Sequence, residues 1–394
     1  MIFAPASEAE AAENIVAARA AKRPLGIEGG GTRAGLGRAA QVEATLSTKR
    51  LAGITLYEPA ELVISAKAGT PLAEIEATLA ARGQMLPFEP MDHRALLGTD
   101  GEPTIGGITA CNISGPGRIS AGACRDHLLG VRLINGRGEA VKSGGRVMKN
   151  VTGLDLVKLN CGAYGTLGLI TEVTYKVLPK PESTGTLALF GLDDARAVEA
   201  LSRALGSPFE VSAAAHLPAG IGSARSRTLL RIENFASSVD YRLRELQKLL
   251  APLGDGLRII EEEADALWRD IRDCRFLAEP RERAVWRVST APMRAASFVA
   301  RLGGELDLRQ FYDWGGGLIW LSVAETGDAG ARAIRAALAS TGGHATLVRG
   351  SPDLRSRIDV FEPLAAPLMK ISAGIKASFD PDAILNPGRM YAGV

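Results

Sequence analysis

The chain has 394 residues and a mass of 41.4 kDa, and 46% of its residues are hydrophobic, 23% charged and 5% aromatic. The length exceeds the ~100–200 residues typical of one domain and the composition is that of a globular protein, so we expect two or more folded domains. The 46 basic and 44 acidic residues give a formal net charge of +2, which argues against nucleic acid as a partner.

Glycine is the compositional outlier, because the chain contains 45 glycines against an average usage near ~7%. The four cysteines form no C-x-x-C motif and have no histidine at metal-ligand spacing, which favours a reduced, cytoplasmic chain. No run of ~18 apolar residues could cross a membrane. The acidic N-terminus is unlike a signal peptide.

The first predicted element is a helix that begins after the N-cap candidate Ser7 and carries acidic residues in its first turns. A short strand over 24–28 follows and leads into three consecutive glycines. Residues 61–68 alternate like a strand. They precede a helix for which Thr70 is the expected N-cap and Pro71 the first helical residue.

Between 98 and 178 the glycine pairs predict a series of short strands. The segment LPKPEST at 178–184 holds two prolines and marks a domain boundary. Beyond it, strand-like segments alternate with helices predicted at 193–205, 237–251 and 328–340, and QFYDWGGGLIWLSV indicates a hairpin. A second βαβ-like unit is expected in this part, although no sequence repeat is evident.

A strand at 344–349 and a helix near 361–378 lead into the final segment, FDPDAILNPGRMY. The predicted fold class is therefore α+β. We expect domains at 1–180 and 181–355, followed by a C-terminal segment, 356–394, that is too short to fold alone and packs back on the rest.

The glycine loop IEGGGTRAGLG at 27–37 has the chemistry of a phosphate-binding loop. Glycines permit positive φ and close backbone approach, so successive N–H groups can converge on an anion, with Thr32 and Arg33 as further donors. The alternative is a flexible surface turn. The residues after Gly31 open no amphipathic helix and no G-x-x-x-x-G-K-[ST] occurs, so the loop is neither a Rossmann fingerprint nor a Walker motif.

Two further glycine-rich strings follow, PTIGGITACNISGPGRISAG at 103–122 and GGRVMKNVTGLDLVKLNCGAYGTLGLITEVTYKVLP at 144–179. Together with the first loop and AGTPLAEIEATLAARG at 68–83, they closely resemble the FAD-binding domain of the vanillyl-alcohol oxidase superfamily, also called the PCMH type. The resemblance covers residues 5–180. It implies a PCMH-type, two-subdomain FAD-binding domain followed by an α+β cap domain.

The resemblance also implies positions that contact FAD. These are Gly29, Gly30, Gly31, Thr32, Arg33, Thr104, Ile105, Gly106, Gly107, Ser114, Gly115, Gly122, Gly165, Thr166, Leu167, Gly168 and Ile170. The string FDPDAILNPGRM at 379–390 resembles the C-terminal return of the superfamily to its flavin domain, which adds Asn386 and brings Pro387, Gly388 and Arg389 near the cofactor. The alternative for this tail is that it only holds the C-terminus in place.

Some members of the superfamily attach FAD to a histidine in the first loop or to a cysteine before the TIGG segment. Gly31 and Glu102 or Pro103 occupy those positions here. The resemblance therefore implies FAD that is bound non-covalently.

The whole pattern and the string GGHATLVRG at 342–350 resemble the D-2-hydroxy-acid dehydrogenase branch and, within it, the FAD-binding subunits of bacterial glycolate oxidases. That family implies a heteromeric complex with a homologous FAD-containing subunit and an iron–sulfur subunit. It also implies a small 2-hydroxy acid substrate such as glycolate, and a cytoplasmic location with peripheral association at the inner membrane through the partner subunits.

Catalytic members of this branch usually carry a metal-binding histidine cluster and a Glu-His-Gly motif. The chain has four histidines that form neither, so no metal site is expected. Oxidation of a 2-hydroxy acid needs a base for the hydroxyl proton and a cation for the carboxylate. The candidates are His344 as the base and Arg349 or Arg287 as the anchor; the alternative is a structural histidine with solvated or salt-bridged arginines.

Two functions remain open from the sequence. The chain is either a flavoprotein subunit that supports assembly or electron transfer beside a homologous catalytic subunit, or a self-sufficient FAD-dependent D-2-hydroxy-acid dehydrogenase of the D-lactate type. The missing histidine cluster favours the first. A third class, the NADPH-dependent UDP-sugar reductases with the same flavin fold, is disfavoured by the LNPGRM ending.

Overall fold

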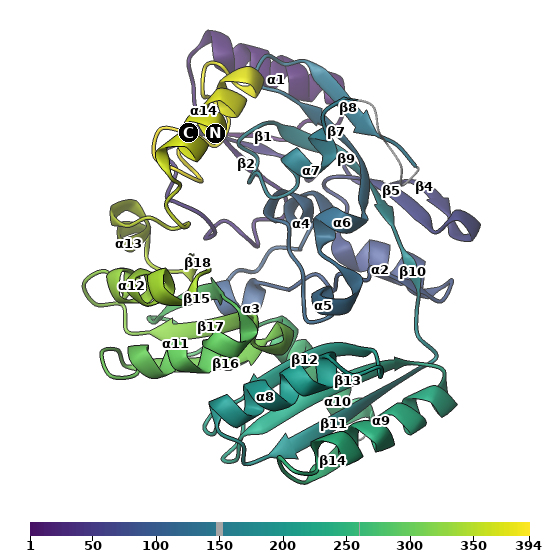
Figure 1. Cartoon of the computed structure of the whole chain (residues 1–394). Coiled ribbons are helices and arrows are strands. Elements are labelled where there is room, and N and C mark those ends of the chain that lie inside the picture. Colours follow the sequence, from purple (N-terminus) through teal and green to yellow (C-terminus); the bar gives the residue numbers. More distant parts are fainter. Residues whose placement is uncertain (147–152, 260) are drawn as a thin grey trace.

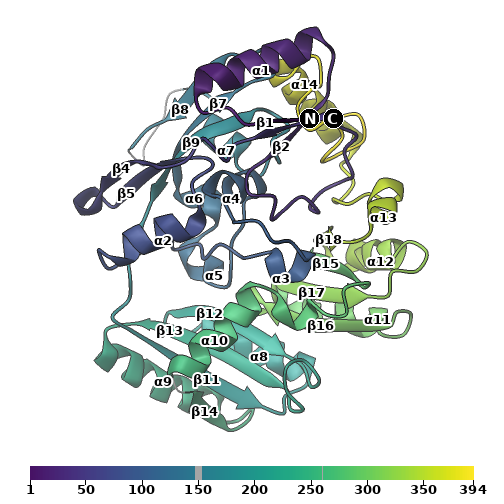
Figure 2. The ribbon, with the colours of Figure 1, turned by 180° about the vertical axis from the view of Figure 1, so that it is seen from behind.

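The computed structural model describes residues 1–146, 153–259 and 261–394 (Figure 1). Residues 147–152 of the predicted cofactor motif lie outside the described part. We call residues 1–182 together with 358–394 the first lobe, and residues 183–357 the second lobe; Figures 1 and 2 show one lobe above the other. The predicted division into domains at residues 180 and 355 remains our proposal.

The first lobe contains a small parallel sheet, a larger antiparallel sheet and a two-stranded ladder. The parallel sheet has the order β1 (Ile2–Phe3), β3 (Ala44–Ser47), β2 (Leu25–Glu28). The five-stranded sheet has the order β4 (Ile54–Glu58), β5 (Val63–Lys67), β9 (Leu169–Lys176), β7 (Leu128–Ile134), β8 (Ala140–Gly144), and the ladder pairs β6 (Gln84–Met85) with β10 (Leu178–Pro179).

The helices of the first lobe before β10 are α1 (Glu8–Ala20), α2 (Leu72–Ala80), α3 (Arg94–Leu97), α4 (Ile105–Cys111), α5 (Arg118–Ala121), α6 (Cys124–His127) and α7 (Leu156–Asn160). The Ser7 hydroxyl accepts a hydrogen bond from the N–H of Glu10, which confirms the predicted N-cap. The prediction for α2 was wrong in one respect. Pro71 occupies the N-cap position, because the Thr70 hydroxyl donates to the carbonyl of Lys67 and accepts from the N–H of Gly53.

Residues 105–127 form short helices, so the short strands predicted for this stretch were wrong. The Thr104 hydroxyl accepts from the N–H of Gly107 and caps α4. Ile105 and Ile108, three residues apart, are both buried on one side of that helix. This spacing is helical, and the glycine pair between them concealed it.

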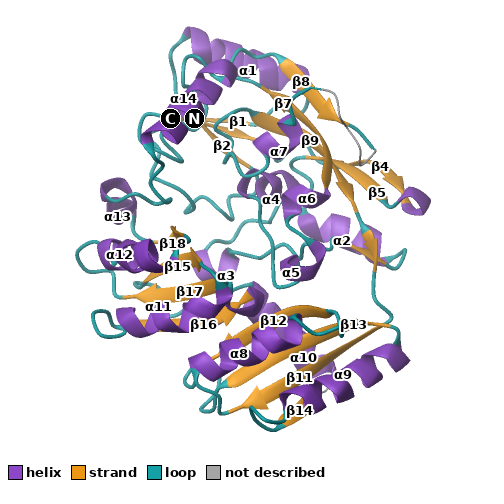
Figure 3. Ribbon diagram, in the orientation of Figure 1, coloured by secondary structure: helices purple, strands orange, loops and turns teal. Residues whose placement is uncertain are grey.

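The second lobe is built on an eight-stranded antiparallel sheet with the order β14-β11-β13-β12-β16-β17-β15-β18 (Figure 3). Its first half comprises β11 (Ser183–Phe190), α8 (Asp194–Leu205), β12 (Val211–Leu217), β13 (Arg227–Asn234), α9 (Ala236–Leu250) and β14 (Gly256–Ile259). Its second half comprises β15 (Ala284–Ser289), α11 (Ala295–Leu302), β16 (Leu308–Asp313), β17 (Leu318–Val323), α12 (Ala331–Thr341) and β18 (His344–Arg349). Each half is a βαββαβ unit, α10 (Glu261–Arg272) connects them, and β12 meets β16 at the pair His216 and Tyr312. The structure therefore repeats a unit whose repetition is not evident in the sequence.

The two faces of this sheet have different neighbours. Buried residues of α11 and α12 pack with Trp286 and Leu347 on one face. On the other face Phe311, Trp320 and Val348 pack with α10 and with residues of the first lobe, among them Met91. This second face therefore closes the junction between the lobes.

The C-terminal segment returns to the first lobe, as predicted. After α13 (Pro352–Arg357), the chain forms α14 (Ala366–Phe379), and Leu385 then bridges to Leu25 of β2. Lys376, which is buried, donates hydrogen bonds to the carbonyls of Thr166 and Leu385. No helix in the described residues is both long and apolar enough to span a membrane.

Candidate cofactor and substrate site

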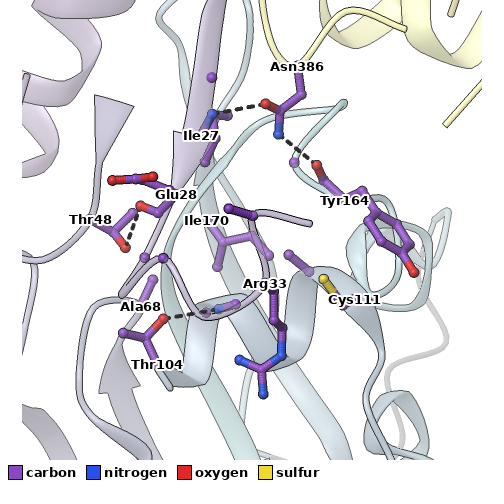
Figure 4. Close-up of a pocket in the computed structure, with 18 of the residues that line it drawn as sticks. Ile27, Glu28, Arg33, Thr48, Ala68, Thr104, Cys111, Tyr164, Ile170 and Asn386 are labelled. Carbon is purple, nitrogen blue, oxygen red and sulfur yellow. Dashed lines mark hydrogen bonds between the residues drawn. The ribbon is translucent and has the colours of Figure 1, made fainter. Parts of the chain in front are cut away.

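The first lobe contains a cavity at the end of β2 (Figure 4). Its volume is about 190 Å³. Residues predicted to contact FAD that line it are Gly29, Gly30, Gly31, Thr32, Arg33, Thr104, Gly106, Gly107, Gly165, Gly168, Ile170 and Asn386. Lining residues that the sequence did not single out are Gly26, Ile27, Glu28, Ala34, Val42, Thr45, Thr48, Ala68, Ala110, Cys111 and Tyr164. Arg389, which was expected near the cofactor, also lines it.

The loop after β2 packs so closely on residues 101–104 that it excludes side chains. A Cβ atom added to Gly30 would lie 1.7 Å from the carbonyl oxygen of Glu102, and one added to Gly29 would lie 2.2 Å from the hydroxyl oxygen of Thr104. Gly31 has a φ of +82°. Among the described residues, none accepts a hydrogen bond from the main-chain N–H groups of residues 29–33. This row of free donors fits a pyrophosphate group such as that of FAD.

The second predicted segment, residues 104–107, supports the wall of the cavity, but two of its main-chain N–H groups are not free to bind a ligand. The N–H groups of Ile105 and Gly106 already donate to the carbonyls of Thr70 and Ala68. A Cβ atom added to Gly106 would lie 2.6 Å from that of Ala68, so this glycine allows α4 to approach β5. The Ile105 side chain lies in the hydrophobic core and not at the cavity.

The opposite wall joins the third predicted segment to the C-terminal return. The Asn386 amide accepts from the N–H of Ile27 at 2.9 Å and donates to the carbonyl of Tyr164 at 2.8 Å (Figure 4). Gly165 and Gly168 lie on this wall, whereas Thr166 and Leu167 are buried away from the cavity.

The remaining predicted FAD contacts lie elsewhere. The Ser114 hydroxyl accepts from the N–H of Cys124, and this serine lines a second cavity described below. The carbonyl of Gly115 accepts from the indole N–H of Trp314 across the junction between the lobes. Gly122 ends α5 with a φ of +94°. The structure does not bring these three residues to the first cavity.

Two arginines place positive charge at the first cavity. Arg33 is buried and donates to the carbonyl of Met91, but its Nε has no partner among the described residues. Arg389 donates to the carbonyl of Ala34. Burial lowers the pKa of both guanidinium groups, so an anion bound here would offset a desolvation cost that the protein leaves uncompensated.

A second, smaller cavity of about 80 Å³ lies where the second lobe meets the first. It shares Cys111 and Tyr164 with the first cavity. The first lobe also contributes His93, and the second lobe contributes Arg287 and Thr346, which are paired across β15 and β18. At ~10–15 Å³ per group, this space holds roughly six water-sized groups, which matches a very small molecule.

Arg287 is the cation of this second cavity. Among the described residues its guanidinium group has no hydrogen-bond or ion-pair partner, although it lies 4.9 Å from the ring centre of Trp314. The Arg118 guanidinium lies 4.5 Å from the same ring. Burial, with Arg118 as a second cause, lowers the pKa of Arg287 to about 10, so the group remains cationic at neutral pH. An unpaired, desolvated guanidinium group is suited to a carboxylate.

The other two predicted catalytic residues have different surroundings. Arg349 donates to the main-chain carbonyls of Leu96, Ala278, Pro280 and Arg283, and these four bonds occupy most of its donors. His344 is exposed at the start of β18, where it pairs with Ser289 next to Arg287. The structure thus brings His344 near Arg287 and uses Arg349 to hold loops together.

His93 is a residue of this site that the sequence did not single out. It precedes α3, is buried, and lines the second cavity with Arg287. Burial, followed by the charge of Arg33, lowers the pKa of His93 to about 3, so its imidazole is neutral at physiological pH. A lone histidine in a loop carries no pattern from which this placement could be predicted.

Comparison with known proteins agrees with this geometry. The family model of the FAD binding domain matches residues 1–144. The chain is 36% identical over 384 residues to glycolate oxidase subunit GlcE of Escherichia coli (strain K12), a match that covers 96% of each chain. It is 28% identical to glycolate oxidase subunit GlcD of Bacillus subtilis (strain 168), over 73% of this chain and 68% of that protein. The 4-ethylphenol oxidase of Gulosibacter chungangensis, in its isoeugenol complex, has the same fold with a TM-score of 0.72 and 14% identity, over 99% of this chain and 89% of that one.

The fold and the cavity lined by glycines define a flavoprotein of the vanillyl-alcohol oxidase type, in the class of FAD-linked oxidoreductases. Within that class, the chain belongs to the family of glycolate oxidase subunit GlcE. The resemblance seen in the sequence is thereby confirmed.

Proposed function

We propose that the chain binds FAD non-covalently in the first cavity and takes part in the oxidation of glycolate, or a similar small 2-hydroxy acid, to the 2-oxo acid. The observation that carries this proposal is the unpaired Arg287 in a small cavity that adjoins the cofactor cavity. FAD bound in the first cavity supplies the two-electron acceptor. Arg287 holds the substrate carboxylate, and the apolar walls formed by Met91, Trp320 and Val348 exclude water and larger acids.

The non-covalent attachment rests on the chemistry of the cavity wall. Cys111 is the thiol among the lining residues, and burial raises its pKa, so the protein does not favour the thiolate that would attack a flavin. Acid precipitation of the FAD-loaded chain is expected to leave the yellow colour in the supernatant. A yellow pellet would contradict this part of the proposal.

The partners follow from the family. We propose that the chain works in a complex with a homologous FAD-containing glycolate oxidase subunit and an iron–sulfur subunit, in the cytoplasm and at the inner membrane through those partners. The 36% identity to a protein named as a glycolate oxidase subunit supports this proposal. The alternative, a self-sufficient D-2-hydroxy-acid dehydrogenase, is favoured by the presence of Arg287 and its cavity within this single chain.

Anaerobic mixing of the purified, FAD-loaded chain with glycolate tests the proposal and separates its two forms. Bleaching of the flavin by the chain alone supports the self-sufficient enzyme. Bleaching that requires the added partners supports the subunit role. If glycolate and D-lactate leave the flavin oxidised under both conditions, the proposed reaction is wrong.

The variant Arg287→Met tests the anchor. Because the guanidinium group has no other partner among the described residues, its removal is expected to weaken glycolate binding roughly 100-fold, the loss typical when one member of a charge pair in a complex is truncated, and to leave FAD content unchanged. Arg332→Met is the matched control, since that arginine side chain in the same lobe is 96% exposed. Equal glycolate affinity in Arg287→Met and the unmodified chain would show that Arg287 does not bind the substrate carboxylate.

A further inference from the structure

His93 and Arg287 lie on opposite lobes and line the same small cavity. His93 belongs to the loop that connects β6 with α3, and only 3% of its surface is exposed. Arg287 belongs to β15. A small acid held by Arg287 would therefore present the rest of its atoms within a cavity that also contains the imidazole.

The hydrogen bond of the imidazole determines which nitrogen is available. Nδ1 of His93 lies 3.3 Å from the carbonyl oxygen of Met91. A carbonyl only accepts, so Nδ1 carries the proton and Nε2 keeps its lone pair. No described residue donates a hydrogen bond to Nε2. The cavity thus holds a hydrogen-bond acceptor without a donor.

Burial is the main reason that the imidazole of His93 is neutral without a ligand. The charges of Arg33 and, to a smaller extent, Arg287 also disfavour an imidazolium. Asp92 is the nearby carboxylate, but it forms an ion pair with Arg94. A carboxylate bound to Arg287 would neutralise one of the two cations, and the imidazole would then hold a proton more readily.

We propose that Nε2 of His93 recognises the hydroxyl group of the substrate and accepts its proton when the 2-hydroxy acid is oxidised. This inference rests on the proposed function, because it assumes that a small 2-hydroxy acid binds at Arg287. With FAD bound in the first cavity as the two-electron oxidant, the hydroxyl proton would pass to Nε2 of His93, and the C2–O bond would become the carbonyl of the 2-oxo acid as the hydrogen on C2 and its electron pair are removed. The chain thereby contains a carboxylate anchor and a proton acceptor in one cavity.

His93→Asn isolates the role of Nε2. The amide nitrogen of asparagine can occupy the place of Nδ1 and keep the bond to the Met91 carbonyl, while nothing replaces Nε2. His93→Gln is the companion variant, because its amide oxygen can accept a hydrogen bond near the Nε2 position but cannot take a proton at neutral pH. His344→Asn is the control, since His344 is exposed and is not among the residues that line the second cavity.

The first readout is binding and does not depend on turnover. Glycolate and acetate differ only in the hydroxyl group, and both can be titrated by calorimetry into the FAD-loaded chain after reduction with dithionite, when glycolate is not oxidised. We expect the unmodified chain and His344→Asn to bind glycolate about 10-fold more tightly than acetate, the value of one hydrogen bond. In His93→Asn the preference should fall to within about twofold because acetate binding is retained and glycolate binding is weakened.

The second readout is the rate of anaerobic flavin reduction by glycolate, with the partner subunits added where they are required. His93→Asn and His93→Gln should both reduce the rate by roughly 100-fold or more, while His93→Gln keeps part of the preference for glycolate. An unchanged preference in His93→Asn, or no preference in the unmodified chain, would overturn the role of His93. A flavin that stays oxidised in the unmodified chain, with the preference for glycolate present, would instead overturn the proposed reaction and leave the recognition of the hydroxyl supported.

Discussion

Arg287 and Arg349 lie on neighbouring strands, β15 and β18, yet their guanidinium groups differ in their hydrogen-bond partners. Arg349 is satisfied by main-chain carbonyls from both lobes, whereas Arg287 has no hydrogen-bond or ion-pair partner among the described residues and lies over the ring of Trp314. Guanidinium donors that the described residues leave unpaired beside a cavity are available to a carboxylate ligand. At the scale of the residue, the unpaired donors and not the residue type identify the anion site.

Asp313 is a second residue whose surroundings are unusual, and it gives a prediction about pH. Burial raises the pKa of Asp313 to about 7 in the folded protein, against about 4 in the unfolded chain. Between these values the folded state holds a proton that the unfolded state has lost, so the free energy of unfolding falls as the pH rises. At ~1.4 kcal/mol per unit, the loss between pH 4 and pH 7 amounts to about 4 kcal/mol.

The variant Asp313→Asn is expected to lack this loss. Asparagine can still accept the hydrogen bond that Asp313 receives from the N–H of Trp314, and it does not titrate. Urea unfolding at pH 5, 6, 7 and 8 should therefore show a shallower decline for Asp313→Asn than for the unmodified chain. Parallel curves would show that Asp313 is ionised in the folded protein throughout this range.

At the scale of the element, the loop after β2 depends on glycine for close packing. Gly30→Ala would place a methyl group against the carbonyl of Glu102, and neither backbone segment can rotate away as a side chain would. We expect this variant to purify without FAD. Gly35→Ala is the matched control, because its Cβ would lie 3.8 Å from Leu97 in ordinary van der Waals contact. Flavin absorbance of the purified proteins checks the prediction, and a fully loaded Gly30→Ala chain would contradict it.

The elements also show what the sequence could and could not predict. The N-terminal helix, the strand before the glycine loop and the helix that follows β5 can be predicted from local patterns of caps and apolar spacing. The helices over residues 105–127 do not, because Gly106 and Gly107 have no side chains to mark a helical period. The N-cap predicted at Thr70 was wrong for another reason, since its hydroxyl group bonds to Gly53, before β4, and to Lys67 at the end of β5.

At the scale of the whole molecule, the site is assembled from segments that are far apart in the sequence. The first cavity combines the loop after β2, helix α4, the start of β9 and the C-terminal tail (Figure 4). The second cavity adds a face of the large sheet. Glycine content and the family resemblance indicated about half of the residues that line the first cavity. The place of His93 at the second cavity could not be predicted, because the opposite wall is a strand nearly two hundred positions later in the chain.

The C-terminal tail is therefore expected to control both the stability of the first lobe and its hold on FAD. Lys376 in α14 forms a buried ion pair with Asp380 at 2.7 Å and donates to the Thr166 and Leu385 carbonyls. Lys376→Met would leave the Asp380 carboxylate buried without its cation, which typically costs ~3–5 kcal/mol. The same change should weaken FAD binding, because Asn386 and Arg389 of the cavity wall follow directly in the chain.

Two further variants distinguish the loss of the Lys376 interactions from a general effect of altering α14. Lys370→Met changes an exposed lysine of the same helix and should leave urea unfolding and flavin content unchanged. The double variant Lys376→Met, Asp380→Asn should recover part of the lost stability, since the uncompensated buried charge is then absent. If the double variant is as unstable as Lys376→Met, the hydrogen bonds of Lys376 to the carbonyls, and not its ion pair, hold the tail against the first lobe.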